Sequence, residues 1–187
     1  MTTRDIQREE TKKRIYDVAF KLFDEFGYDK VKVSDIAKAA NVSVGSVYYH
    51  YKNKEAIIDY GYYEFDQMLK EAYEKQIFDS EREAILFLID FQIKDVFLDI
   101  GLKMTTICFK NQINAENTYL HSDKRYLYQK LLENLNNIQH MNKEHAAKMM
   151  LRISRGSIYD WCCHNGSYDL IEAVHEEISI VLDYIGL

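Results

Sequence analysis

The chain has 187 residues, of which 47% are hydrophobic and 29% charged, a composition typical of a globular protein. The three cysteines argue against a disulfide framework and favour a reducing, cytoplasmic setting. Because the sequence shows no signal peptide and no apolar stretch long enough to span a bilayer, we expect a soluble protein without membrane contact.

The net charge of −6 hides an asymmetry along the chain. Residues 1–56 carry eleven Lys and Arg against nine Asp and Glu, which makes this segment +2. Residues 57–187 carry the other thirteen basic residues against twenty-one acidic ones, which makes them −8. A mildly basic head on an acidic body favours DNA contact by the head alone, with chance fluctuation as the alternative.

Apolar residues recur at helical spacing along the whole chain, and no strand-like alternation appears. The absence of proline also favours long helices. The first predicted helix carries its apolar residues from Ile15 to Phe26, and Gly27 follows at its end. These patterns predict an all-α protein of about nine helices.

Two short helices are predicted next, over residues 33–40 and 44–51. Asn41 lies in the tight turn between them, where it tolerates the left-handed conformation. Ser43 is predicted to cap the second short helix, and Asn53 a long fourth helix. This arrangement predicts a helix-turn-helix.

Beyond the fourth helix, Ser80-Glu81-Arg82-Glu83 has the sequence of a capping box, and Ser167 is expected to cap the last helix. Five further helices are expected over residues 81–101, 102–114, 127–138, 146–161 and 168–185.

The stretch "SVGSVYYHYKNK", residues 43–54, places hydroxyl, imidazole and ammonium donors on a short predicted helix. Val47 and Tyr51 are expected to face inward, whereas Tyr48 and Tyr49 face solvent. Phosphate oxygens require donors of this kind. Lys54 stands at the start of the fourth helix, whose exposed amides already favour an anion. We interpret this edge as facing DNA.

Residues 27–57, "GYDKVKVSDIAKAANVSVGSVYYHYKNKEAI", resemble the DNA-binding domain of the tetracycline-repressor (TetR) family. The resemblance implies a helix-turn-helix domain over residues 1–53 and a helical effector-binding and dimerisation domain over residues 54–187. It implies a homodimeric transcriptional regulator, usually a repressor and not an enzyme, that binds a pseudopalindromic DNA operator. The DNA contacts it implies are Ser43, Val44, Gly45, Ser46, Tyr48, Tyr49, His50 and Lys54. We expect Lys32 and Ser34 to contact DNA as well.

Three positions depart from the family pattern. Asn41 replaces the usual glycine of the turn, which is physically tolerable. Lys32 replaces a threonine that caps the second helix, which puts that cap in doubt and offers a phosphate contact instead. Val44 makes no hydrogen bond, so it would read a base only through an apolar contact such as a thymine methyl.

The resemblance also places a small-molecule effector between the fourth and eighth helices. The expected contacts, with Phe97 beside them, are Tyr63, Phe87, Phe91, Met104, Cys108, Phe109 and Trp161, which predict an apolar or aromatic effector. An aromatic stripe at helical spacing also occurs as ordinary core, and this alternative stays open. The sequence does not identify the effector.

The last two helices carry broad apolar faces. Paired across a two-fold axis, they would form a four-helix bundle, which is the family's dimer interface. The alternative is that these faces fill the monomer's own core.

Cys162-Cys163-His164 suggests a second function, a redox or metal sensor, although buried structural cysteine is the simpler interpretation. Adjacent helical residues point about 100° apart, so the two thiols need partners from elsewhere to chelate a metal. No enzyme motif is present, and no cofactor or metal is expected. A protein-docking module that does not bind DNA is the third alternative.

Overall fold

The computed structural model describes residues 2–114 and 122–187, which form nine α-helices and one π-helical segment with no strand. The all-α prediction is confirmed. The elements are α1 (Thr3–Phe26), α2 (Val33–Ala39), α3 (Val44–His50), α4 (Lys54–Tyr73), α5 (Glu81–Gln92), η1 (Ile93–Leu98), α6 (Gly101–Asn114), α7 (Tyr126–Glu133), α8 (Lys143–Cys163) and α9 (Leu170–Ile185).

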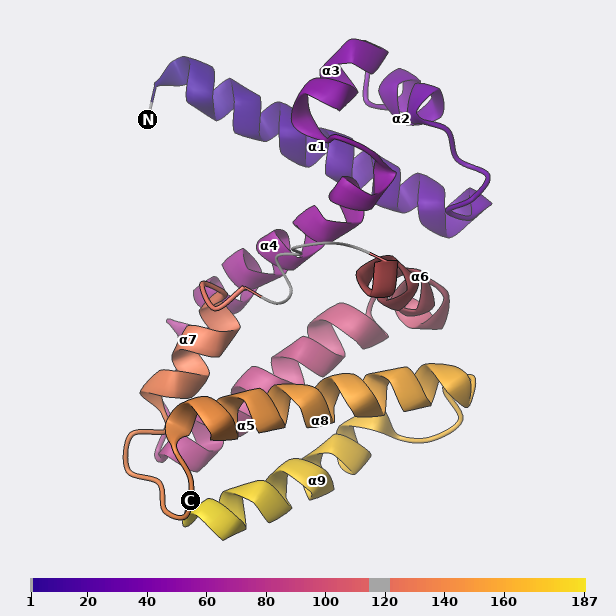
Figure 1. The fold of residues 1–187 in the computed structure, drawn as a ribbon. Helices are drawn as coiled ribbons and strands as arrows, with labels where there is room; N and C mark the ends of the chain where they lie inside the picture. Colours follow the sequence, from indigo (N-terminus) through magenta and orange to yellow (C-terminus); the bar gives the residue numbers. More distant parts are fainter. Residues whose placement is uncertain (1, 115–121) are drawn as a thin grey trace.

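Helices α1, α2 and α3 gather at one end of the molecule, and α4 leads from them into the rest of the chain (Figure 1). Helices α5, α7, α8 and α9 lie at the other end, where α8 and α9 run side by side. Helix α6 packs against α1 and α4 as well as against α8. Helices α4 and α6 therefore both connect the two ends.

The local signals of the N-terminal region produce the predicted turns and caps. Asn41 has φ 53° and Gly27 has φ 89°, so both adopt the left-handed region as expected. The Ser43 hydroxyl accepts a hydrogen bond from the Ser46 amide at 3.0 Å. The Asn53 side chain accepts one from the Ala56 amide at 2.9 Å, which begins α4 at the predicted residue.

Helix boundaries in the body differ from those predicted. Helix α5 ends at Gln92 and continues as η1, and Gly101 with φ 75° begins α6, so a single helix to Gly101 was wrong. Helix α7 ends at Glu133 instead of continuing to residue 138. The cap of α9 is Asp169 and not Ser167, because the Asp169 carboxylate accepts a bond from the Glu172 amide at 3.0 Å.

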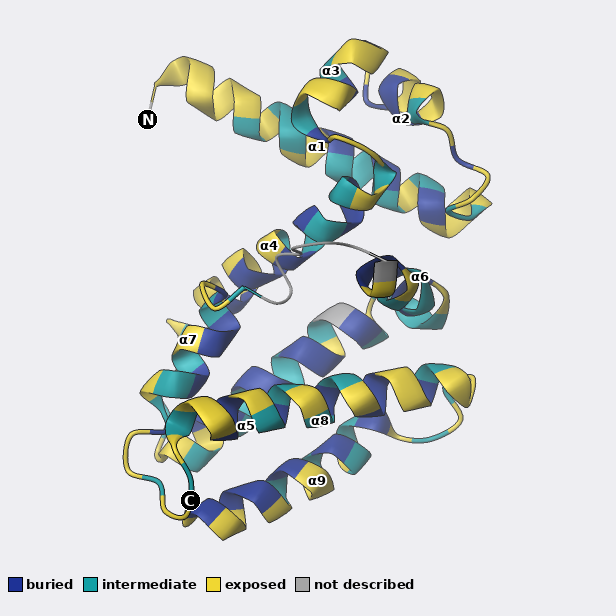
Figure 2. Ribbon diagram, in the orientation of Figure 1, coloured by how far each residue is buried: buried dark blue, intermediate teal, exposed yellow. Residues whose placement is uncertain are grey.

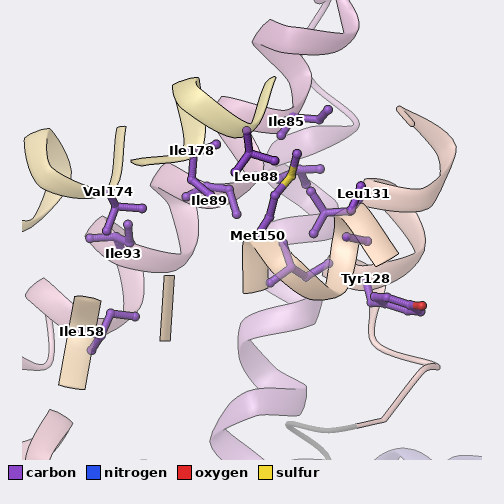
Figure 3. Packing of buried hydrophobic residues seen from close by; sticks show 14 of the residues in the cluster. Ile85, Leu88, Ile89, Ile93, Tyr128, Leu131, Met150, Ile158, Val174 and Ile178 are labelled. Carbon is purple, nitrogen blue, oxygen red and sulfur yellow. The ribbon is translucent and has the colours of Figure 1, made fainter. Parts of the chain in front are cut away.

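Two clusters of buried apolar residues hold the chain together. The larger joins α4, α5, η1, α7, α8 and α9, and Figure 3 shows part of it around Leu88, Ile89 and Met150. The smaller joins α1 to α4 and includes Met104 and Cys108 from α6. The division into domains at residues 53 and 54 stays a prediction.

Within the described ranges, no helix is both long and apolar enough to cross a membrane.

Candidate nucleic-acid interface and interior cavity

Helices α2 and α3 form a tight helix-turn-helix on a buried base. The Val42 amide donates to the Ala37 carbonyl at 3.0 Å, which closes the turn. Ile36, Val47 and Tyr51 are buried beneath it. The Tyr51 hydroxyl also donates to the Lys12 carbonyl of α1 at 2.9 Å, so it is a core residue as expected.

The side chains that remain on α3 are directed outward. Tyr48 is 53% exposed, Tyr49 is 71% exposed and Val44 is also exposed. Figure 2 shows α3 as a mostly exposed helix on a buried base. Among the other predicted contacts, Lys32, Ser34, Ser43 and Gly45 are exposed, whereas Ser46 and His50 are partly buried. The structure thus presents these residues at the surface of one helix-turn-helix.

Gly45 has no steric reason to be a glycine within this chain. A Cβ atom at this position would meet only the Ser43 hydroxyl, at an ordinary 3.7 Å. A helical glycine costs about 1 kcal/mol relative to alanine, so the fold alone favours a larger residue here. The missing side chain leaves room for another surface to approach the start of α3 closely.

The Lys54 side chain makes contacts within the protein that its sequence position does not reveal. Its ammonium group donates to the Tyr28 carbonyl at 2.8 Å and to the Val31 carbonyl at 2.9 Å. It also lies 4.3 Å from the centre of the Tyr28 ring. Lys54 therefore ties the start of α4 to the loop between α1 and α2, and its phosphate contact stays a prediction.

Lys32 precedes α2 without capping it through its side chain. Asp35 provides the cap instead, because its carboxylate accepts the Lys32 amide at 2.8 Å. The Lys32 side chain is exposed, and its phosphate contact stays a prediction.

Helix α1 adds positive charge beside α3, which the sequence analysis missed. The pKa of His50 is lowered, first by its burial and then by the charges of Lys12 and Arg8. The basic residues of the first turns of α1 precede its apolar positions, and only the fold brings them beside His50. Arg8 and Lys12 thus lie near the candidate interface, where the charge of Glu9 partly opposes their effect on His50.

The predicted effector contacts do not gather around one cavity. Met104 and Cys108 are buried in the N-terminal core, where burial raises the pKa of the Cys108 thiol to about 12. Tyr63 is exposed and stacks on Tyr60. The remaining four contacts lie in separate places. Phe87 packs on Phe91, and Phe109 packs on Phe97. The indole N–H of Trp161 donates a hydrogen bond to the Tyr168 carbonyl.

A different set of residues forms a cavity of about 280 Å³ between α5, the start of α7 and α8. This place agrees with the expected position between the fourth and eighth helices. Its wall includes Arg125, Tyr128, Lys148, Arg152 and Arg155. None of the seven predicted effector contacts is among its described lining residues.

Arg125 connects this cavity to α4. Its guanidinium lies 2.8 Å from the Asp66 carboxylate, and both side chains are almost completely buried, at 4% and 1% exposure. Asp66 also accepts the Tyr126 amide at 2.9 Å. The pair fixes the first turn of α7 against the middle of α4 and neutralises one of the cavity's positive charges.

Helices α8 and α9 leave an apolar surface beside each other. Ile180 is 70% exposed, and Tyr159 and Tyr184 are more than half exposed. Gly156 lies at the same surface, where a Cβ atom would meet nothing within 4 Å. Part of the apolar faces of α8 and α9 fills the protein's own core, whereas Ile180, Tyr159 and Tyr184 lie outside it.

The cysteine pair belongs to no group of potential metal ligands among the residues that the structure describes. Cys163 is exposed, Cys162 is partly buried and neither is in a disulfide. Over residues 2–114 and 122–187, no three His, Cys, Asp or Glu side chains are grouped so as to hold a metal ion. The geometry of this pair gives no support to a metal sensor.

Known proteins resemble the two parts of the chain to different degrees. Residues 15–60 match the sequence model described as "Bacterial regulatory proteins, tetR family". The biofilm operon negative transcriptional regulator IcaR of Staphylococcus epidermidis is 50% identical over 46 residues, 25% of each chain. The transcriptional regulator AcrR of Shigella flexneri is 42% identical over 48 residues, 26% of this chain and 22% of that protein. Residues 15–60 are thus similar to the N-terminal region of tetR-family regulators. These alignments span about a quarter of the curated relatives' length.

Solved structures of tetR-family proteins extend the likeness in fold to almost the entire chain. Thermus thermophilus FadR in complex with lauroyl-CoA has a TM-score of 0.67 at 19% identity, covering 93% of this chain and 94% of its own. Bacillus subtilis FadR in complex with stearoyl-CoA has a TM-score of 0.63 at 20% identity, covering 92% and 98%. The described chain therefore shares its overall fold with these regulators at low sequence identity.

Proposed function

We propose that this protein is a cytoplasmic, homodimeric transcriptional regulator, a repressor that a small-molecule effector releases from its DNA operator. The observation that carries the DNA-binding part is the surface of α3. Its glycine has no role in the protein's own packing, and it stands beside exposed tyrosines and hydroxyls. The match of residues 15–60 to the tetR family model supports this reading, and the curated relatives are described as transcriptional regulators.

On this proposal, α3 enters the major groove. Ser46, Tyr48, Tyr49 and His50 would contact bases or adjacent phosphates, while Ser43, whose hydroxyl already caps α3, would position the helix. Lys32 and the neighbouring Ser34 at the start of α2 would contact the DNA phosphates. Arg8 from α1 would do the same. Lys54 would act on DNA mainly by holding the loop before α2 in place.

The dimer would form through α8 and α9. A monomer gains nothing from exposing Ile180, Tyr159 and Tyr184 beside a helical glycine, whereas a two-fold partner would bury all of them. Two-fold symmetry would then place the two α3 helices in successive major grooves, about 34–36 Å apart or somewhat more. A pseudopalindromic operator follows from that symmetry.

The effector would occupy the cavity between α5, α7 and α8. The FadR proteins of similar fold are described in complex with acyl-CoA molecules, which supports an effector site in the body. Asp66 on α4 holds Arg125 at the cavity wall, and Lys54 on the same helix holds the loop before α2. A displacement at Arg125 would therefore reach the DNA-binding head through α4. Gly61, between them, packs against the Tyr16 hydroxyl, so we assign it close packing instead of helix bending.

The decisive experiment is a titration of the full chain with duplexes selected from a random pool, repeated across salt concentrations. We expect tight binding to a pseudopalindromic site, with affinity falling steeply as salt rises. Lys32→Gln should weaken binding to all duplexes alike and make the salt slope shallower by about one unit. Tyr49→Ala should change the order of preference among operator variants if the phenol reads a base.

Lys75→Gln removes an exposed charge at the far end of α4 and is the matched control, because it should leave the salt slope unchanged. Failure to bind any duplex with salt-dependent affinity would exclude the proposed function. It would favour the protein-docking alternative.

A further inference from the structure

The cavity between α5, α7 and α8 is dominated by positive charge. Its described lining contains Arg125, Lys148, Arg152 and Arg155, against a single acidic residue, Asp123. The chain as a whole has a net charge of −6, so this concentration is opposite to the protein's average. Side chains of one charge sign that line the same cavity favour a ligand of the opposite sign there.

Three of these cations come from one face of α8. Positions 148, 152 and 155 are spaced by four and three residues, which places their side chains in a row along the helix. Like charges at this spacing destabilise a helix by about 0.2–0.5 kcal/mol per pair. The row is therefore not explained by the stability of α8.

Arg125 and Arg155 are held in position by their surroundings. Asp66 compensates the charge of Arg125 from behind the cavity wall. The Arg155 Nε–H donates to the Leu151 carbonyl one turn earlier in α8 at 2.8 Å, which restrains the plane of its guanidinium. Burial lowers the pKa of Arg155, and the charges of Arg125 and Arg152 lower it further. Arg152 and Arg155 are three residues apart on α8, both line the cavity, and they lie close enough to act together.

The rest of the wall is apolar and aromatic. Leu127, Tyr128 and Leu151 line the cavity beside the cations. Tyr128 lies at the edge of the main core cluster, beyond Leu131 (Figure 3). A volume of about 280 Å³ is near the lower end of the range for small-molecule sites. The wall therefore offers an apolar surface for a small molecule and a cationic one for a negatively charged group.

We propose that this cavity binds a small organic anion, in which a carboxylate or phosphate group on an apolar or aromatic body is held by Arg152 and Arg155. Planar guanidinium groups bind both kinds of oxyanion through paired N–H donors. The proposal rests on the proposed function, because it names the chemical class of the effector for that same cavity. It adds a negative charge to the apolar or aromatic body expected from the sequence.

The inference is tested by calorimetric titration of the full-length protein with phenylacetate, phenyl phosphate and the neutral phenylacetamide. We expect at least one of the anions to bind about tenfold more tightly than the amide. The two anions distinguish a carboxylate site from a phosphate site. Equal binding of all three probes, or no binding of either anion at millimolar concentration, would overturn the proposal.

Variants locate the site. Arg152→Gln and Arg155→Gln should each abolish the preference for the anion, whereas Lys143→Gln on the same helix should retain it, because Lys143 does not line the cavity. Circular dichroism identifies a variant that fails to fold, and the exposed Arg152 is the safer position. An unchanged preference in folded Arg152→Gln would contradict the proposal.

DNA binding is measured separately, with and without the anion. Salt-dependent duplex binding tests the regulator without reference to the cavity, and the calorimetric preference tests the cavity without DNA. Anion binding that leaves DNA affinity unchanged would support the site and reject its regulatory role. If the anion does weaken DNA binding, then operator DNA must weaken anion binding by the same factor.

Discussion

The head and the body differ in where they place their polar groups. The buried polar and charged residues of the described chain all lie beyond residue 60, and Asp66, Gln92 and Arg125 are among them. The core beneath α1 to α3 is made of apolar and aromatic side chains. The polar residues of these three helices lie outside that core. The head therefore presents its polar groups at its surface, where a partner can contact them. The body buries several of its own polar groups.

The largest expected effect comes from breaking the buried ion pair of the body. Asp66→Asn keeps the shape of the side chain but leaves the Arg125 charge buried without its carboxylate. We expect the free energy of unfolding to fall by about 3–5 kcal/mol. Urea denaturation followed by circular dichroism measures this change.

A surface ion pair that touches the head provides the control. Lys13 lies 2.8 Å from Glu64, and their side chains are 53% and 16% exposed, so Lys13→Met should cost about 1 kcal/mol, well below the loss at Asp66. Similar losses in the two variants would show that the contrast between head and body does not govern stability.

A smaller effect on DNA affinity, without loss of stability, is expected at the surface of α3. Gly45→Ala should leave the protein as stable or slightly more stable, because the added Cβ atom meets no close neighbour. The same methyl group would obstruct the approach of the DNA and lower affinity by about tenfold, equivalent to about 1.4 kcal/mol. Thermal unfolding and duplex titration measure the two quantities.

Gly61→Ala is the matched comparison on α4. Its Cβ atom would lie 3.0 Å from the Tyr16 hydroxyl, so this variant should lose stability.

Unchanged DNA affinity in Gly45→Ala would remove the main support for an interface at α3.

The smallest expected effect is a pH dependence of DNA binding that His50 confers. Burial and the positive charges of Lys12 and Arg8 lower the pKa of His50 in the free protein and favour its neutral form. A neighbouring phosphate stabilises the charged form and raises that pKa in the complex. Binding therefore takes up a proton, and acidification through the interval between the two pKa values should raise affinity by about two- to threefold.

Duplex titrations across mildly acidic to neutral pH measure this dependence, and His50→Gln provides the reference. If both proteins show the same pH profile, His50 does not lie near a phosphate.

The same contrast explains how much the sequence could predict. The head was predictable because its signals are local: Asn41 fits the turn, Ser43 and Asn53 cap the next helices, and Tyr51 is buried where the helical period places it. The family model matches this part of the chain. The fold class of the body followed from helical periodicity in the same way.

The cavity was not predictable, because helical periodicity does not distinguish a cavity wall from a core. Met104 and Cys108 have the spacing of cavity residues but are buried against the head. Arg152 and Arg155 have the spacing of solvated charges but line the cavity. Asp66 and Arg125 are 59 residues apart, so their pairing has no signal at short range.

The packing of α6 bears on how freely this architecture can be recombined. Met104 and Cys108 complete the core of the head, and Lys103 donates to the Asp24 carbonyl at the end of α1 at 2.5 Å. A head transplanted at residue 53 would lose this cover and expose apolar surface. A chimera that joins this head to another body of the same fold would therefore need to carry the facing residues of α6 as well. The interchangeable unit is a discontinuous set of helices, and a cut at a single chain position does not isolate it.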